Sequence, residues 1–176
     1  MDITEKIIEA IGGDIWQSGL VSSDRLIISN EVREACEKNY CGCYGKCWTC
    51  PPGVGGLDEM KQKLLKFSNV FVFTTKHELE DCFDYEGMQT AHRLHDEITE
   101  KIKPLCREYG ALVLGAGRCS ICRECTYPDS PCRFPDKATV SLEACGINVV
   151  ELSKTAGINY INGKDTVTYF TAVLFN

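Results

Sequence analysis

The stretch NVFVFTTKHELEDCFDYEGMQTAHRLHDEITEKIKPLCREYGALVL, residues 69–114, carries the strongest secondary-structure signals in the chain. It opens with the apolar and β-branched run Asn69–Thr75, which predicts a strand. Over Tyr85–Tyr109 the apolar residues recur every three or four positions, which predicts a long helix that Gly110 ends. The apolar run Ala111–Leu114 then predicts a buried strand. This stretch therefore indicates a sheet with a helix packed against it.

Weaker signals flank this stretch on both sides. Apolar periodicity predicts shorter helices at Ile3–Ile11, residues 30–39, Leu57–Phe67 and Ser141–Ala156, the last with a break at Gly146. Strand signals are the apolar run Arg25–Ile28 and a C-terminal hairpin around Asn162-Gly163. We therefore predict an α+β (or α/β) fold with one mixed β-sheet covered by helices. Residues 1–176 are expected to form a single metal-binding domain, with two cysteine-rich loops at the sheet edge.

The composition is that of a globular chain and argues against two classes of partner. The chain has 176 residues, of which 44% are hydrophobic, a formal net charge of −6 and a pI of about 5.1. An acidic chain without a long basic run is a poor candidate for nucleic-acid binding, and no apolar run is long enough to span a membrane. The opening MDITEKIIEAIGG does not have the pattern of a signal peptide. We expect a cytoplasmic protein with no nucleic-acid and no membrane partner.

Twelve cysteines distinguish this chain from an ordinary globular domain. Five lie in Cys36–Cys50, which we call the first module, and four lie in Cys119–Cys132, which we call the second module. The other three are isolated: Cys82, Cys106 and Cys145. In a reducing cytosol, clustered cysteines bind metal more often than they form disulfides. The clustering therefore predicts metal binding.

The second module has the spacing Cys119-x2-Cys122-x2-Cys125-x6-Cys132, followed by Arg-Phe-Pro. Three cysteines at steps of three allow one short loop to wrap a cubane and ligate three of its irons, and a fourth cysteine then comes from farther away. The bacterial ferredoxin motif has a shorter last gap of three residues, whereas this chain has six. The spacing predicts a [4Fe–4S] site. It leaves open whether Cys132 closes this cluster or serves the other module.

The first module offers more thiols than one cubane needs: Cys36, Cys41, Cys43, Cys47 and Cys50. Its loop is rich in glycine, so backbone N–H groups can point at cluster sulfurs. We predict a second [4Fe–4S] cluster on Cys36, Cys41, Cys47 and Cys50. The spacing itself leaves open which of the five thiols are ligands.

Zinc is the main alternative metal for both modules. Zinc sites usually use separated C-x2-C pairs, and none of the three histidines lies near either module in the sequence. Four cations lie beside the cysteines and would favour an anionic cluster, although each is equally explained as a solvated charge: Lys46, Arg118, Arg123 and Arg133.

The strings CGCYGKCWTCPPGVG and GAGRCSICRECTYPDSPCRFPDKATVSLEACGINV resemble a family of predicted metal-binding proteins, a domain-of-unknown-function family of bacteria and archaea. The resemblance extends over most of the chain and includes the pattern C-x4-C-G-x-Y-G-K-x-W-x-C-P-P from Cys36 to Pro52. The chain departs from the family pattern by extra thiols at Cys43 and Cys47. It also has Cys145 in place of an aromatic residue, which makes Cys145 a candidate, beside Cys132, for a ligand shared between sites. The resemblance implies metal binding and no particular reaction.

Three functions are compatible with these modules. The first is an electron-transfer module of anaerobic metabolism, in which two clusters pass single electrons to a redox partner protein. The second is a cluster enzyme: if Cys36, Cys41 and Cys50 alone hold a cubane, its open iron can bind a small-molecule substrate for dehydration or desulfuration. The third is a zinc-stabilised interaction module. The sequence has no phosphate-binding glycine loop and no nucleophile elbow, which favours the first.

Four further residues are given structural interpretations. His92 and His95 lie three positions apart on the long predicted helix, and we expect both at its surface. Cys82 and Cys106 are expected as small core residues rather than as ligands.

Overall fold

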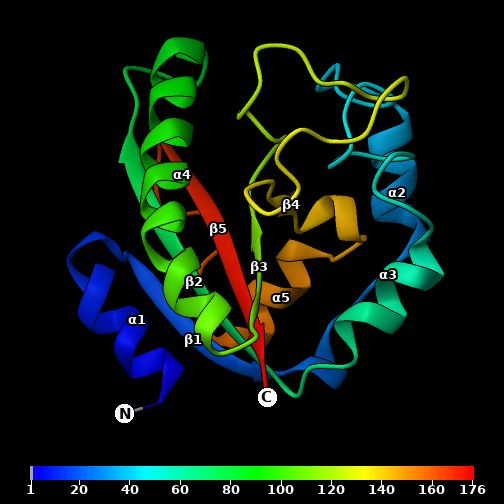
Figure 1. The fold of residues 1–176 in the computed structure, drawn as a ribbon. Coiled ribbons are helices and arrows are strands. Elements are labelled where there is room, and N and C mark those ends of the chain that lie inside the picture. Colours follow the sequence, from blue (N-terminus) through cyan, green and yellow to red (C-terminus); the bar gives the residue numbers. More distant parts are fainter. Residues whose placement is uncertain (1) are drawn as a thin grey trace.

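The computed structural model describes residues 2–176 and has a mixed sheet of five strands at its centre (Figure 1). The strand order is β1-β2-β5-β3-β4, and neighbouring strands are antiparallel except for β3 and β4, which run parallel. The strands are β1 (Gln17–Ser22), β2 (Asn69–Glu78), β3 (Leu112–Gly115), β4 (Val140–Ser141) and β5 (Thr166–Phe175). This confirms the predicted α+β fold with one mixed sheet.

Helices cover both faces of this sheet (Figure 1). One face packs against α1 and α4, and the other against α3, α5 and the short 3₁₀ turn η3. The helices are α1 (Ile3–Ile11), α2 (Asn30–Glu37), α3 (Leu57–Leu64), α4 (Tyr85–Glu108) and α5 (Val149–Ala156), with 3₁₀ turns η1 (Gly12–Asp14), η2 (Ser23–Arg25) and η3 (Glu143–Cys145). No helix within residues 2–176 is both long and apolar enough to cross a lipid bilayer.

The sequence of β2 explains why both faces of the sheet are covered. Val70 and Val72 point to the face that α3 and α5 cover, whereas Phe71 and Phe73 point to the face that α1 and α4 cover. All four side chains are buried. A strand that is apolar on both faces requires a layer of helices on each side of the sheet. The strand β2 also lies in the interior of the sheet, between β1 and β5.

The helix α1 begins at a capping box. Asp2 Oδ1 accepts a hydrogen bond of 2.9 Å from the Glu5 backbone N–H, and Glu5 Oε2 accepts one of 2.9 Å from the Asp2 backbone N–H. The side chains of Ile3, Ile7 and Ile11 share one face of the helix and are buried against the sheet. The predicted bounds of this helix are confirmed.

The predicted strand at Arg25–Ile28 is wrong. This segment contains the end of η2 and a single β-bridge between Ile28 and Ile147, and the first strand of the sheet lies earlier, at Gln17–Ser22. Only Val21 of β1 is buried. The strand therefore lacks the apolar alternation from which it could have been predicted.

The predicted hairpin around Asn162-Gly163 is also wrong. Residues 158–165 form no strand, and β5 pairs with β2 on one side and with β3 on the other. The Asn162 side chain donates hydrogen bonds to the Asn159 carbonyl at 3.2 Å and to Thr168 Oγ1 at 2.9 Å. Since strands from elsewhere in the chain occupy both edges of β5, no edge is free for a hairpin partner.

The predicted break at Gly146 within Ser141–Ala156 is confirmed, whereas the predicted helix before it is wrong. The strand β4 and the turn η3 precede the glycine, and α5 follows it. Gly146 has a φ of +79°, and a Cβ at this position would lie 2.3 Å from Cδ1 of Leu57. Glycine therefore allows the chain to turn here while α3 packs closely against it.

Candidate metal centre

The two cysteine modules lie side by side on loops at one end of the sheet (Figure 1). The first module begins near the end of α2, and the second follows β3. Trp48 Nε1 donates a hydrogen bond of 3.0 Å to the Ser130 carbonyl, and the Cys119 backbone N–H donates one of 3.2 Å to Thr49 Oγ1. These bonds join residues 82 and 70 positions apart, so the tertiary fold brings the modules together.

An aromatic contact and a glycine complete the junction between the modules. The rings of Trp48 and Tyr127 meet edge to face, with centroids 4.9 Å apart. A Cβ at Gly53 would lie 2.8 Å from Tyr127 Cε2 and 2.7 Å from the Cys47 carbonyl oxygen. Glycine at position 53 therefore lets Tyr127 of the second module pack directly on the chain of the first.

We predict that Gly53→Ala loosens this junction and lowers the free energy of unfolding by roughly 1–3 kcal/mol, because the added methyl group overlaps Tyr127. Chemical denaturation of anaerobically purified protein measures the change. Gly13→Ala is the matched control, since a Cβ at position 13 meets no atom within 4 Å. Equal losses in the two variants would show that close packing at Gly53 is not the cause.

The thiols of the second module border one small cavity of about 30 Å³. Its lining includes Cys119, Cys122, Cys125 and Cys132, and also Cys47 of the first module. Burial raises the pKa of Cys119, and the nearby thiols of Cys132 and Cys122 raise it further because each becomes an anion on ionisation. A bound metal would supply the positive charge that stabilises these thiolates together.

Three other thiols of the first module lie around Cys50. Burial raises the pKa of Cys50, and the thiols of Cys47, Cys43 and Cys41 raise it further. Cys47 is buried, and its Sγ lies 3.6 Å from Thr49 Oγ1. Cys43 Sγ donates a hydrogen bond of 3.3 Å to the Cys41 carbonyl. These four positions form a second group of thiols next to the first cavity.

Cys36 lies at the margin of this group, on α2. Burial raises the pKa of Cys36, and the thiol of Cys41 raises it further. Both cysteines border an open hollow of about 410 Å³ that Glu143 also lines. The structure thus brings three of the four predicted ligands together and places Cys36 beside one of them. It also places Cys43, which is outside the predicted ligand set, within the group.

One of the predicted cations acts across the two modules. Burial and the neighbouring Cys41 raise the pKa of Cys43 in the first module, and the positive charge of Arg118, which precedes the second module, partly offsets this rise. Arg133 instead donates from Nη1 to the Glu124 carbonyl at 2.9 Å. Arg118 therefore favours thiolate at the junction, whereas Arg133 holds the loop of the second module in shape.

The donor set of both modules consists of thiols. All twelve cysteines of the chain are free. Within residues 2–176, no three His, Cys, Asp or Glu side chains converge as they would around a single ion. A cluster does not need such convergence, because each of its irons takes its own thiolate. Soft thiolate ligands suit iron–sulfur clusters and zinc, so the residues fit either group.

The isolated cysteines lie in other parts of the fold. Cys145, in η3, is fully buried in the core beneath α3 and α5, and burial raises its pKa to about 12. Cys106 is buried in α4, as expected. Cys82 is exposed, so the expected core position of this residue is wrong.

A buried polar network surrounds His95 and was not predicted from the sequence. This side chain is fully buried, so its expected surface position is wrong. Its Nδ1 shares a hydrogen bond of 2.8 Å with Thr75 Oγ1, and its Nε2 shares one of 2.9 Å with Thr171 Oγ1. The signal was present in the sequence, because His95 lies four positions after Ala91 and three before Ile98 on the apolar stripe of α4.

The other two histidines adjoin the same network. The rings of His77, His92 and His95 lie around Tyr169, with centroid separations of 6.5, 5.2 and 5.7 Å. His92 Nε2 shares a hydrogen bond of 2.8 Å with the carbonyl of Ala116, which lies just before the second module. His92 therefore links this network to the chain that leads into the second module.

Comparison with protein families gives one match. A family model described as "Predicted metal-binding protein (DUF2284)" matches residues 19–175, a range that includes both modules. No curated protein and no solved structure matches the chain.

Proposed function

The chain belongs to the DUF2284 family of predicted metal-binding proteins. We propose that its two cysteine modules hold two [4Fe–4S] clusters that transfer electrons. One observation carries the proposal: the second-module thiols and Cys47 of the first module border the same cavity. Two clusters held by these groups would be neighbours. Neighbouring clusters can exchange single electrons without any movement of the chain.

The second cluster is held by the four second-module thiols at the shared cavity: Cys119, Cys122, Cys125 and Cys132. The first is held by the predicted set Cys36, Cys41, Cys47 and Cys50. Clusters of this kind supply one-electron oxidation and reduction when bound. The chain binds the clusters, places Trp48 and Tyr127 between the loops that carry them, and presents Arg118 to the anionic thiolates. The reaction partner is a redox protein that gives or accepts one electron.

A cluster enzyme is the second candidate function, and the hollow at Cys36 and Cys41 favours it. This hollow of about 410 Å³ is open to solvent. If Cys47 serves the shared cavity instead of the first cluster, one iron of that cluster is free to bind a small molecule through the hollow.

Anaerobic purification followed by iron and sulfide analysis tests the proposal. We expect about eight irons and eight sulfides per chain, and reduced clusters whose electron paramagnetic resonance signals interact. Zinc in place of iron, without sulfide, would contradict both candidates. Mössbauer spectra of the same sample separate them: uniform thiolate ligation supports electron transfer, whereas one iron of distinct ligation supports the enzyme.

A further inference from the structure

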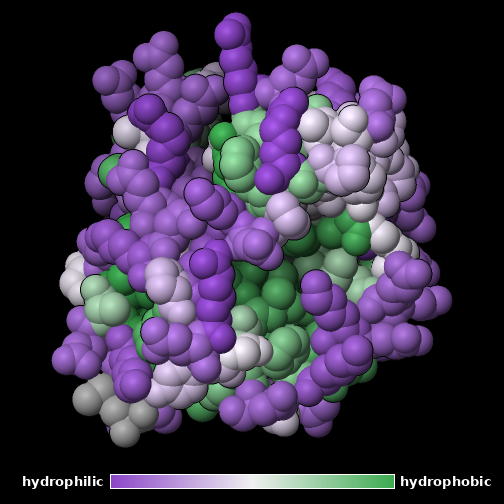
Figure 2. Space-filling view, viewed as in Figure 1, coloured by the Kyte–Doolittle hydropathy of each residue, from purple (hydrophilic) through white to green (hydrophobic). Residues whose placement is uncertain are grey.

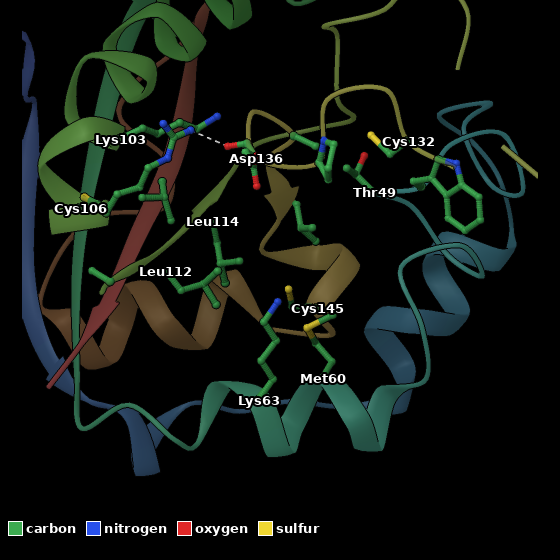
Figure 3. Close-up of a pocket in the computed structure, with 17 residues that line it drawn as sticks. Thr49, Met60, Lys63, Lys103, Cys106, Leu112, Leu114, Cys132, Asp136 and Cys145 are labelled. Atoms are coloured by element: carbon green, nitrogen blue, oxygen red, sulfur yellow. Dashed lines mark hydrogen bonds between the residues drawn. The ribbon is translucent and has the colours of Figure 1, made fainter. Parts of the chain in front are cut away.

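A larger hollow lies beside the metal centre and extends beyond both modules. It encloses about 390 Å³ between α4, the strand β3, the helix α3 and the chain that follows the second module. Figure 2 shows an apolar depression on this side of the molecule, bordered by hydrophilic side chains. Figure 3 shows side chains from these separate elements directed into one space. Small-molecule sites occupy hollows of roughly 300–1,000 Å³, so this one is of the size that takes a small ligand.

The hollow exists because the sheet ends early at this edge. The strand β4 pairs only with Leu114 and Gly115, so the outer edge of β3 at Leu112 and Val113 has no partner strand within residues 2–176. The open edge forms the back of the hollow. Figure 3 shows Leu112 and Leu114 lying there, opposite Met60 of α3. The wall is therefore apolar and would bind a hydrocarbon group.

The mouth of the hollow is cationic although the chain carries a net charge of −6. Three cations line it, Lys63, Lys103 and Arg107, against one carboxylate, Asp136. The buried Lys103 ammonium is neutralised by the Glu100 carboxylate and also donates to the Lys137 carbonyl at 2.7 Å.

The other two cations, Lys63 and Arg107, form no ion pair within residues 2–176 and can therefore interact with a ligand. Arg107 Nη2 donates to the backbone carbonyl of Asp136 at 2.5 Å, which orients the guanidinium without neutralising it. Lys63 has no carboxylate partner within residues 2–176. Figure 3 shows its ammonium pointing from α3 into the hollow toward the buried Cys145. The hollow therefore holds two cations, Lys63 and Arg107, against the single carboxylate of Asp136, beside an apolar wall.

We propose that this hollow binds a small organic anion with an apolar body, such as a medium-chain carboxylate. The anionic group pairs with the Lys63 ammonium, and the hydrocarbon body lies on Leu112, Leu114 and Met60. The inference goes beyond the electron-transfer function and does not depend on which metal the cysteines hold. Trp48, Thr49, Cys132 and Ala138 line both this hollow and the cavity of the second module, so the bound anion would lie next to that module.

Isothermal titration calorimetry with octanoate and with 1-octanol tests the proposal on protein purified anaerobically with its metal. Both probes have the same hydrocarbon length, and only octanoate is charged. We expect octanoate to bind at least about tenfold more tightly than 1-octanol, because only its carboxylate is attracted to the cations of the hollow. Equal affinities for the two probes would overturn the proposal, as would the absence of heat with octanoate.

Two variants and one control test whether octanoate binds in this hollow. Lys63→Glu should weaken octanoate binding about tenfold or more by reversing the charge at the mouth, and Leu112→Trp should weaken both probes by filling the hollow. Lys61→Glu is the control, because Lys61 lies on the same helix and does not line the hollow. Equal effects of Lys61→Glu and Lys63→Glu would overturn the assignment. Iron content measured on each sample shows separately whether the metal sites remain loaded.

Discussion

Cys122→Ser is expected to remove the metal of the second module and to leave that of the first. Cys122 is the middle cysteine of the C-x2-C-x2-C run and borders the shared cavity with the three other cysteines of the second module. A serine hydroxyl is a harder and weaker ligand for iron or zinc than a thiolate, so the site loses a quarter of its donors. We expect bound iron and sulfide to fall by about half, from about eight to about four of each per chain.

The measurement pairs metal analysis with a matched cysteine variant. Cys82→Ser is the control, because Cys82 is exposed and lies outside both modules. Far-ultraviolet circular dichroism of each variant reports whether the fold is retained. Full iron content in Cys122→Ser would remove this residue from the ligand set, and an equal loss in Cys82→Ser would show that the effect is not specific to the cavity.

Acidification is expected to destabilise the protein through His95. Both ring nitrogens bond to threonine hydroxyls in the core, and burial, with smaller effects of His92 and His77, lowers the pKa of His95 to about 3. The ordinary pKa of histidine is about 6.5. The unfolded chain therefore binds a proton between these two values that the folded chain does not bind. The resulting stability is complete above pH 6.5 and is lost as the pH falls toward 3.

The expected loss through this one group is about 2 kcal/mol between pH 7 and pH 5. Urea denaturation at both pH values measures it, in the wild type and in His95→Gln. The variant is expected to be less stable at pH 7, since glutamine cannot bond to both Thr75 and Thr171 as the ring does. Its stability should nevertheless depend less on pH, by about the same 2 kcal/mol. Identical pH slopes in the two proteins would refute the assignment.

Local patterns in the sequence predicted the parts of the fold that local chemistry determines. The strand β2 and the helix α1 follow from side-chain periodicity, because each buries whole faces of its own residues. The C-x2-C-x2-C spacing likewise indicated that the thiols of the second module lie together, since three of its four cysteines lie on one short loop. These features depend on residues that are close together in the chain.

Features that depend on distant residues were not predictable in the same way. Asn162-Gly163 just before β5 is a typical hairpin sequence. The strand nevertheless pairs with β2 and β3, which lie far away in the sequence. The relative positions of Cys36 and Cys43 depend on where α2 ends and how its loop packs on the second module. The spacing alone does not distinguish these two thiols. The fold places Cys36 at the margin of the first-module thiols and Cys43 among them.

The junction between Trp48 and Ser130 also has a consequence for the newly synthesised chain. The 82 residues that separate this pair take about 4–16 s to translate at roughly 5–20 residues per second. Throughout that interval the first cysteines to leave the ribosome lack the loop that will cover them. The cavity that Cys47 shares with the second module therefore forms only after that module has been made, so under the proposed ligand set the two clusters are completed late in synthesis.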